Sequence, residues 1–200
     1  MRPMAPTVWT MRRKWLGNLI PALFWLPLAI AGVWDMASRQ EIAGQGLWLL
    51  IAATVLGWLA VNLFGFWDNA RMRRQLVRIL QAKGENVADS VFVGFATPRY
   101  SSMLDPHEDV GFLVLLPDRL EFVSESRKIE VSKEQIEGVR FRMNIHTLIG
   151  LGRWVSIEGT AEGKPIRLLI EPRERRTLLG NFRYGKSLKQ KIKRWSKPNT

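Results

Sequence analysis

Two long apolar stretches in the first third of the chain set it apart from an ordinary soluble sequence. They cover residues 16–34 and 47–67, and neither contains a charged side chain. Each approaches the ~20 apolar residues needed to cross a hydrocarbon core about 30 Å thick. Tryptophans stand nineteen residues apart in both stretches, as Trp15–Trp34 and Trp48–Trp67. That interval is about 28 Å along a helix, so the pattern predicts two membrane spans with tryptophans in the interfacial belts.

A cleaved signal peptide is the alternative interpretation of the first stretch. Arg12, Arg13 and Lys14 would then form its basic beginning. However, the apolar run is longer than that of a usual signal peptide, and no small-x-small cleavage site follows Trp34. The prediction is therefore a helical hairpin over residues 15–67.

The distribution of Lys and Arg predicts how this hairpin is oriented. Basic residues precede the first span and follow the second, whereas the connecting loop, 35–46, contains only Arg39. Loops rich in Lys and Arg stay on the cytoplasmic side of a membrane. We therefore expect a multi-pass protein of the cytoplasmic (inner) membrane with both termini in the cytoplasm. Residues 1–14 would be a basic cytoplasmic N-terminus.

Three residues of the second span are candidates for helix–helix contact. Ala53 and Gly57 form a small-xxx-small pair, and Asn62 places an amide at membrane depth. Small residues allow two helices to approach closely, and a buried amide needs a hydrogen-bonding partner. The contact is either with the first span of the same chain or with a second copy in a homodimer, and the sequence leaves both open.

The hydrophobic pattern changes from helical to strand-like behind the second span. Residues 68–84 keep a helical spacing of apolar positions, which predicts a juxtamembrane helix that continues the span. Alternation then predicts seven strands, at 90–96, 110–116, 119–124, 127–131, 136–142, 153–159 and 165–171. An amphipathic helix is expected after Pro172, where it can cover an open end of the sheet.

Two segments of this region carry the pattern of a known superfold. Residues 111–123 read GFLVLLPDRLEFV, and residues 128–139 read KIEVSKEQIEGV. They resemble the bacterial pleckstrin-homology-like (PH-like) and GRAM-like domains, and the resemblance covers about half of the chain. It implies that residues 86–200 form a β-rich PH-like barrel or sandwich with a C-terminal capping helix. The loop 97–109 has Arg99 alone against three carboxylates, so the resemblance does not extend to the basic inositol phosphate site of some PH domains.

The charge of the chain is strongly positive but unevenly placed. A net charge of +12 and a pI of about 10.7 are typical of nucleic-acid-binding proteins. Residues 1–83 carry +7, residues 84–172 carry −4 and residues 173–200 carry +9. This distribution suits anionic lipid rather than a nucleic-acid groove. The candidate lipid contacts in the tail are Lys186, Lys189, Lys191, Lys193 and Arg194. The same residues could instead be the solvated face of a capping helix.

Residue types that carry chemistry are sparse. The chain has no Cys, which removes disulfides and thiolate nucleophiles. His107 and His146 lack a partner at ligand spacing, and His107 is expected in a solvated loop. No nucleophile elbow, P-loop or zinc-protease motif occurs. We therefore predict no catalytic residues, metal or cofactor, and a chain that is not an enzyme.

One apolar connection has two possible interpretations. Residues 143–151 are unusually apolar for a segment between strands. They are either a longer strand buried in the fold or an exposed patch that meets the membrane or a partner.

These expectations favour a non-catalytic, membrane-tethered PH-like module that mediates protein or lipid interaction. The alternative is an accessory or assembly subunit of a larger membrane complex, which it contacts through the hairpin. The expected partners are anionic membrane lipids and an unidentified membrane or cytoplasmic protein, with a homodimer as a further possibility.

Overall fold

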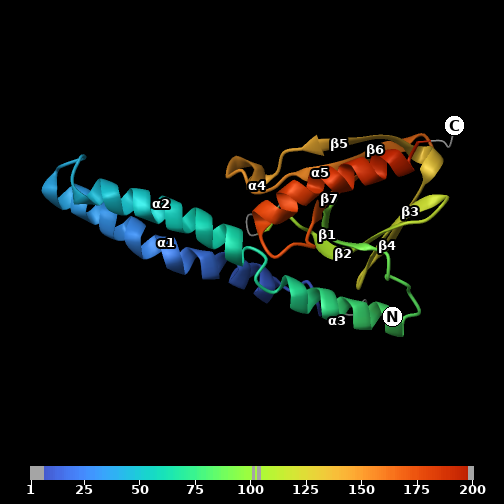
Figure 1. Ribbon diagram of the computed structural model, residues 1–200, viewed down its shortest axis with the longest axis horizontal. Helices are drawn as coiled ribbons and strands as arrows, with labels where there is room; N and C mark the ends of the chain where they lie inside the picture. The colour runs from blue at the N-terminus through green and yellow to red at the C-terminus, as the bar shows by residue number, and fades with distance from the viewer. Residues whose placement is uncertain (1–6, 101, 103–104, 198–200) are drawn as a thin grey trace.

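A helical hairpin projects from one end of a β-sheet domain in the computed structural model, which describes residues 7–100, 102 and 105–197 (Figure 1). Helix α1 spans Met11–Arg39 and helix α2 spans Gln45–Phe64. The two helices lie side by side and antiparallel. The side chain of Thr10 caps α1 by accepting a hydrogen bond from the Arg13 backbone N–H. Both helices include the predicted apolar stretches, except that α2 ends three residues before Trp67.

The hairpin exposes its apolar side chains instead of burying them. Leu23, Val33 and Leu63 are each more than half exposed. Both helices are long and apolar enough to cross a membrane. Apolar side chains of a soluble protein's core helix would be covered by the rest of the fold. The hairpin therefore has the surface expected of a membrane anchor.

The third helix is separated from α2 by a turn, so the prediction of one continuous helix is wrong. Helix α3 spans Asn69–Ala82 and begins after the turn at residues 65–68. A side chain at Gly65 would approach Leu178 to 2.7 Å, so the C-terminal helix packs directly on this turn. The apolar face of α3, with Leu76 fully buried, packs on the sheet. Because this face is buried on the sheet, α3 does not continue along the axis of α2. Helix α3 is therefore part of the domain.

Seven antiparallel strands form one open sheet in the order β4-β3-β2-β1-β7-β6-β5. The strands are β1 Val91–Ala96, β2 Asp109–Leu115, β3 Arg119–Ser124, β4 Lys128–Ser132, β5 Ile136–Arg142, β6 Trp154–Ala161 and β7 Lys164–Pro172. A 3-10 turn, Lys133–Gln135, joins β4 to β5. Each strand lies within two residues of its predicted limits. The β6–β7 hairpin turns at Glu162 and Gly163, whose positive φ angles of 52° and 73° suit a tight two-residue turn.

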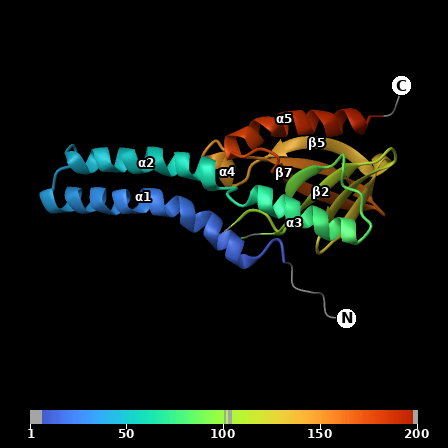
Figure 2. The ribbon, with the colours of Figure 1, turned by 60° about the horizontal axis from the view of Figure 1, so that its bottom comes forward.

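Strand β1 is buried on both faces because a helix covers each face of the sheet (Figure 2). Val93 and Phe95 point to one side, where they pack in the same core as Ile192 of helix α5, Leu178–Trp195. Phe92 points to the other side, into a core that contains the buried face of α3. Val8 and Trp9, which precede α1, complete this second core. The N-terminal segment is therefore part of the domain.

The apolar connection between β5 and β6 is a short helix, so its interpretation as a longer strand is wrong. Helix α4 spans Ile145–Leu148 and is capped at Asn144, whose side chain accepts a hydrogen bond from the Thr147 N–H. Met143 and Leu148 are each 71% exposed. The segment is thus an exposed apolar patch, the other interpretation of its sequence.

Candidate functional site

Buried and half-buried ionisable side chains gather where the hairpin meets the domain. We call this group the junction cluster, and its members are Asp105, His107, His146, Glu171 and Arg173. Asp105 and His107 come from the loop before β2, and His146 comes from α4. Glu171 and Arg173 lie at the end of β7. His107 is 0% exposed, Glu171 1% and Arg173 3%.

Carboxylates and imidazoles alternate along the cluster. His107 Nδ1 lies 2.7 Å from Asp105 Oδ1, and His107 Nε2 lies 3.0 Å from Glu171 Oε2. The second contact has the length of an ion pair but not the direction of a hydrogen bond. His146 Nδ1 lies 3.1 Å from the same Glu171 oxygen. One buried carboxylate therefore faces two imidazoles.

Two glycines provide the space for these rings and carboxylates. A Cβ at Gly94 would lie 1.9 Å from the His107 ring. A Cβ at Gly152 would lie 2.1 Å from Glu171 Oε1. Both approaches are far shorter than any van der Waals contact, so only glycine fits beside the cluster.

Arg173 connects the cluster to the base of the hairpin. Its guanidinium carbon lies 4.7 Å from the Trp9 ring centroid and 4.3 Å from that of Phe66. The Arg173 Nε–H donates to Asn69 Oδ1 at 2.8 Å. Trp9 Nε1 donates to the His107 carbonyl at 3.1 Å. Segments before α1, between α2 and α3, and after β7 are thus joined through one guanidinium.

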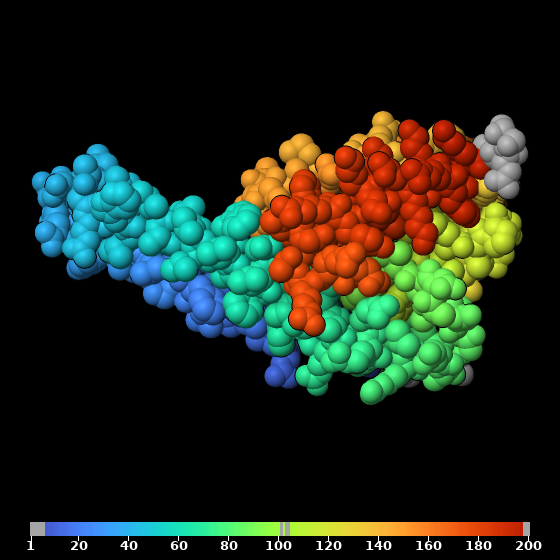
Figure 3. Space-filling view, viewed as in Figure 1, coloured from blue at the N-terminus to red at the C-terminus, as the bar shows by residue number. Residues whose placement is uncertain are grey.

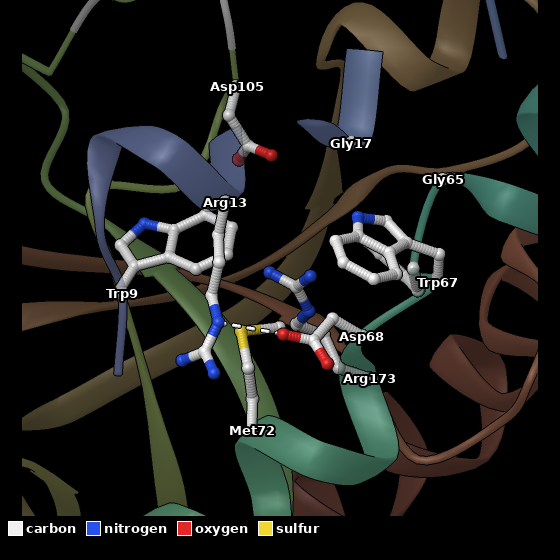
Figure 4. A pocket seen from close by; sticks show the side chains of 10 residues that line it. Trp9, Arg13, Gly17, Gly65, Trp67, Asp68, Met72, Asp105 and Arg173 are labelled. Carbon is white, nitrogen blue, oxygen red and sulfur yellow. Dashed lines mark ion pairs between the residues drawn. The ribbon is translucent and has the colours of Figure 1, made fainter. Parts of the chain in front are cut away.

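A second ion pair lies beside this arginine. Arg13 Nε and Asp68 Oδ2 are 2.7 Å apart, and Figure 4 shows the pair next to Trp9 and Arg173. The space enclosed by these side chains is about 10 Å³, which holds one water molecule at most. The side chains around this ion pair are therefore closely packed, whereas a larger cavity of about 780 Å³ opens on another side of Phe66 and Arg173.

The pKa values of four members of the cluster are shifted by burial and by their charged neighbours. Burial raises the pKa of Asp105, but the neighbouring His107 outweighs burial and holds that pKa at about 2. Burial likewise raises the pKa of Glu171, and His146 and His107 together lower it to about 2. Burial lowers the pKa of His107, and the attraction of Asp105 outweighs this and raises it above 6.5. Burial lowers the pKa of Arg173 to about 10, opposed by Asp105 and Glu171.

These shifts predict a stability maximum in mildly acidic solution. Stability from the raised pKa of His107 is fully present below pH 6.5 and is lost as pH rises through its folded-state pKa. Stability from Asp105 and Glu171 is present above their usual pKa values of 3.8 and 4.5 and is lost as pH falls toward 2. The thermal unfolding midpoint of the detergent-solubilised protein should thus be highest between pH 4.5 and 6.5. His107→Gln should abolish the decline above pH 6.5, and an unchanged decline would contradict this assignment.

The three candidate helix-contact residues all meet groups of the same chain. A Cβ at Gly57 would lie 3.1 Å from Trp25, so α1 packs against this glycine. Ala53 is 4% exposed. Asn62 Oδ1 accepts a hydrogen bond from the Leu179 N–H at the beginning of α5, at 2.9 Å. The amide in the second apolar stretch thus joins the hairpin to the C-terminal helix.

The basic residues of the tail lie on α5, which runs away from the hairpin (Figures 1 and 2). The helix begins beside Asn62, and near its end Trp195 Nε1 donates to the Leu116 carbonyl. Lys189 lies over the Phe141 ring at 4.4 Å. The other four cations are exposed: Lys186, Lys191, Lys193 and Arg194. If the hairpin crosses a membrane, this direction carries them away from that bilayer, so their placement does not favour the expected lipid contact.

The expectation that His107 lies in a solvated loop is wrong. The ring is fully buried, and its centroid lies 5.9 Å from that of His146, although the two are far apart in sequence. Two features of the sequence could have indicated a buried polar cluster. They are Gly94 within the apolar strand 91–96 and Glu171 within the apolar segment 168–172. Within residues 7–100, 102 and 105–197, no group of three or more His, Asp or Glu is arranged to hold a metal ion.

Comparison of the chain with family models, with curated proteins and with solved structures finds no match. The architecture itself therefore defines the class of protein. It is a two-helix apolar hairpin joined, through a buried charged cluster, to a seven-stranded antiparallel sheet with a C-terminal helix.

Proposed function

We propose that the hairpin α1–α2 crosses the cytoplasmic membrane twice and that the domain is a non-catalytic, PH-like interaction module on the cytoplasmic side. The observation that carries the proposal is the exposed apolar surface of the hairpin, which projects beyond the domain. A surface of this kind is stable only in contact with lipid or other apolar groups. The excess of Lys and Arg on both flanks supports cytoplasmic termini.

The arrangement of the sheet supports the PH-like part of the proposal. The first four strands form an antiparallel meander, and the last three form a second one. Strand β1 pairs with β7 and joins the two halves. The C-terminal helix packs on the sheet through Leu188 and Ile192. This order of elements is the one that the resemblance of residues 111–139 implies.

The junction gives such a module a fixed orientation. The ion pair between Arg13 and Asp68 and the hydrogen bond between Asn62 and Leu179 hold the base of the hairpin to the domain. Packed contacts of this kind oppose swinging of the domain on a flexible linker. The exposed cations of α5 would then face the cytoplasm, where an acidic surface of a partner protein is electrostatically complementary to them.

Topology is the first test of this proposal. Reporter fusions after residue 10 and at residue 200 should both read cytoplasmic, and a fusion at Gln40 in the α1–α2 loop should read external. The physical reason is the asymmetry of Lys and Arg across the two helices. A C-terminus on the external side would overturn the layout.

The interaction itself is tested by crosslinking in the same cells. Changing Lys186, Lys191 and Lys193 to Gln should reduce the amount of partner protein that is recovered with the chain after crosslinking. A matched loss of three exposed charges on the sheet, at Lys128, Lys164 and Arg167, should leave it unchanged. If recovery instead depends only on the sequence of the hairpin, the chain is better described as an assembly subunit that contacts a complex through α1 and α2.

A further inference from the structure

Helix α4 and its flanks present apolar side chains outward and polar ones inward. Met143, Ile145, Leu148 and Ile149 are 71%, 59%, 71% and 43% exposed. The polar residues between them are half-buried and hydrogen-bonded within the chain. This is the reverse of the usual arrangement on a water-exposed surface. Residues 143–152 also contain no Lys, Arg, Asp or Glu.

The polar side chains of this segment have partners inside the protein. Asn144 Nδ2 donates to Glu171 Oε2 at 3.1 Å, and His146 contacts the same carboxylate. Thr147 Oγ1 donates to the Gly152 carbonyl at 2.8 Å. These bonds fix which face of the segment points outward. The exposed apolar residues are thus held on the surface by the buried cluster beneath them.

The segment lies against the hairpin, beside the end of α2 nearest the domain (Figures 1 and 3). Trp58 Nε1, on α2, donates to the Ile149 carbonyl at 3.0 Å. Ile149 also lines an apolar groove of the hairpin together with Trp25 and Trp58. The apolar surface of the patch is therefore continuous with that of the proposed membrane anchor.

The level of this contact along α2 places it inside the hydrocarbon layer. Trp58 is thirteen residues beyond Gln45, where α2 begins, which corresponds to about 20 Å. A hydrocarbon core about 30 Å thick that begins between Gln45 and the interfacial Trp48 therefore extends ~10–15 Å beyond Trp58 toward the domain. Apolar faces of interfacial helices reach about 5–10 Å into the boundary between headgroups and acyl chains, which meets the shallow end of this range.

We infer that the α4 patch, formed by Met143, Ile145, Leu148 and Ile149, is embedded in the cytoplasmic leaflet of the bilayer that the hairpin crosses. Its occupant is lipid hydrocarbon, because the patch is uncharged and continuous with the lipid-facing surface of α2. The Trp58 indole satisfies the Ile149 carbonyl, which would otherwise face hydrocarbon without a partner. The patch would set the depth and tilt of the domain. This inference rests on the proposed crossing of the membrane.

Single cysteines test the inference in the full-length chain, because the natural sequence has none. The variants are Leu148→Cys in the patch, Val55→Cys as a control in the hairpin and Lys164→Cys as an exposed control in the domain. All three replace exposed side chains, so each should fold. In inside-out membrane vesicles, Leu148→Cys and Val55→Cys should react with a membrane-impermeant maleimide at least about tenfold more slowly than Lys164→Cys, because an apolar environment suppresses the thiolate.

A second measurement identifies what covers the patch. A fluorophore attached at Leu148→Cys should be quenched by brominated lipids, as should one attached at Val55→Cys, whereas one attached at Lys164→Cys should not be. Protection from maleimide without this quenching would mean that a protein covers the patch, and would overturn the inference. Fast labelling of Leu148→Cys with protected Val55→Cys would overturn it while leaving the hairpin in the membrane. Fast labelling of both would overturn the membrane crossing as well.

Discussion

Replacing Glu171 with alanine should destabilise the protein by roughly 3–5 kcal/mol, the cost of removing one partner from a buried ion pair. Glu171 is 1% exposed and faces both His107 and His146. Without Glu171, Asp105 would be the one carboxylate left in the junction cluster, beside two imidazoles and the guanidinium of Arg173. The measurement is the thermal or denaturant unfolding midpoint in mild detergent.

Two variants separate the charge of Glu171 from other effects of mutation. Glu171→Gln keeps the size of the side chain and its acceptor for Asn144, so it should cost less than Glu171→Ala. Glu134→Ala removes an exposed carboxylate and should change stability by no more than about 0.5 kcal/mol. Equal effects of Glu171→Ala and Glu134→Ala would show that the cluster adds nothing to stability.

Replacing Leu76 with alanine should cost about 2–5 kcal/mol, because the side chain is fully buried between α3 and the sheet. The cavity would open beside Phe92 and Phe112, whose rings are 5.4 Å apart. The same measurement of unfolding reports this loss. A fragment that begins at residue 86 lacks α3 and should for the same reason be less stable than the whole domain. In that fragment the apolar core around Phe92 and Phe112 would be exposed to solvent.

The matched control is Arg78→Ala, on the exposed face of the same helix. It should change stability by no more than about 0.5 kcal/mol. If Leu76→Ala had no larger effect than Arg78→Ala, α3 would be a linker that rests on the sheet without stabilising it.

Local pattern was sufficient for the seven strands, although not for the short helix α4 or for the turn between α2 and α3. Strands β3 and β5 have the limits that alternation predicts, Arg119–Ser124 and Ile136–Arg142. The period of apolar residues is a property of neighbouring positions, so a single strand or helix can be recognised without its partners. The two apolar helices were predictable for the same reason, since their length and hydropathy do not depend on the domain.

Contacts between distant residues decided the rest. Loop residue His107 is buried because Gly94, Asp105 and Glu171 meet around it, and such a meeting leaves no periodic trace in the sequence. Helix α3 turns away from α2 because its apolar face has a sheet to cover, which the helical pattern alone cannot indicate.

An apolar hairpin, seven strands and a basic amphipathic C-terminal helix can all be recognised from the order of residues along the chain. How these parts are joined, and which surfaces they present, follows from the packing of the folded molecule. In that packing the cations of α5 lie away from the hairpin and the apolar residues of α4 lie beside it. Direction and burial depend on packing partners far apart in the chain, whereas the type of an element depends mainly on residues within a few positions of one another.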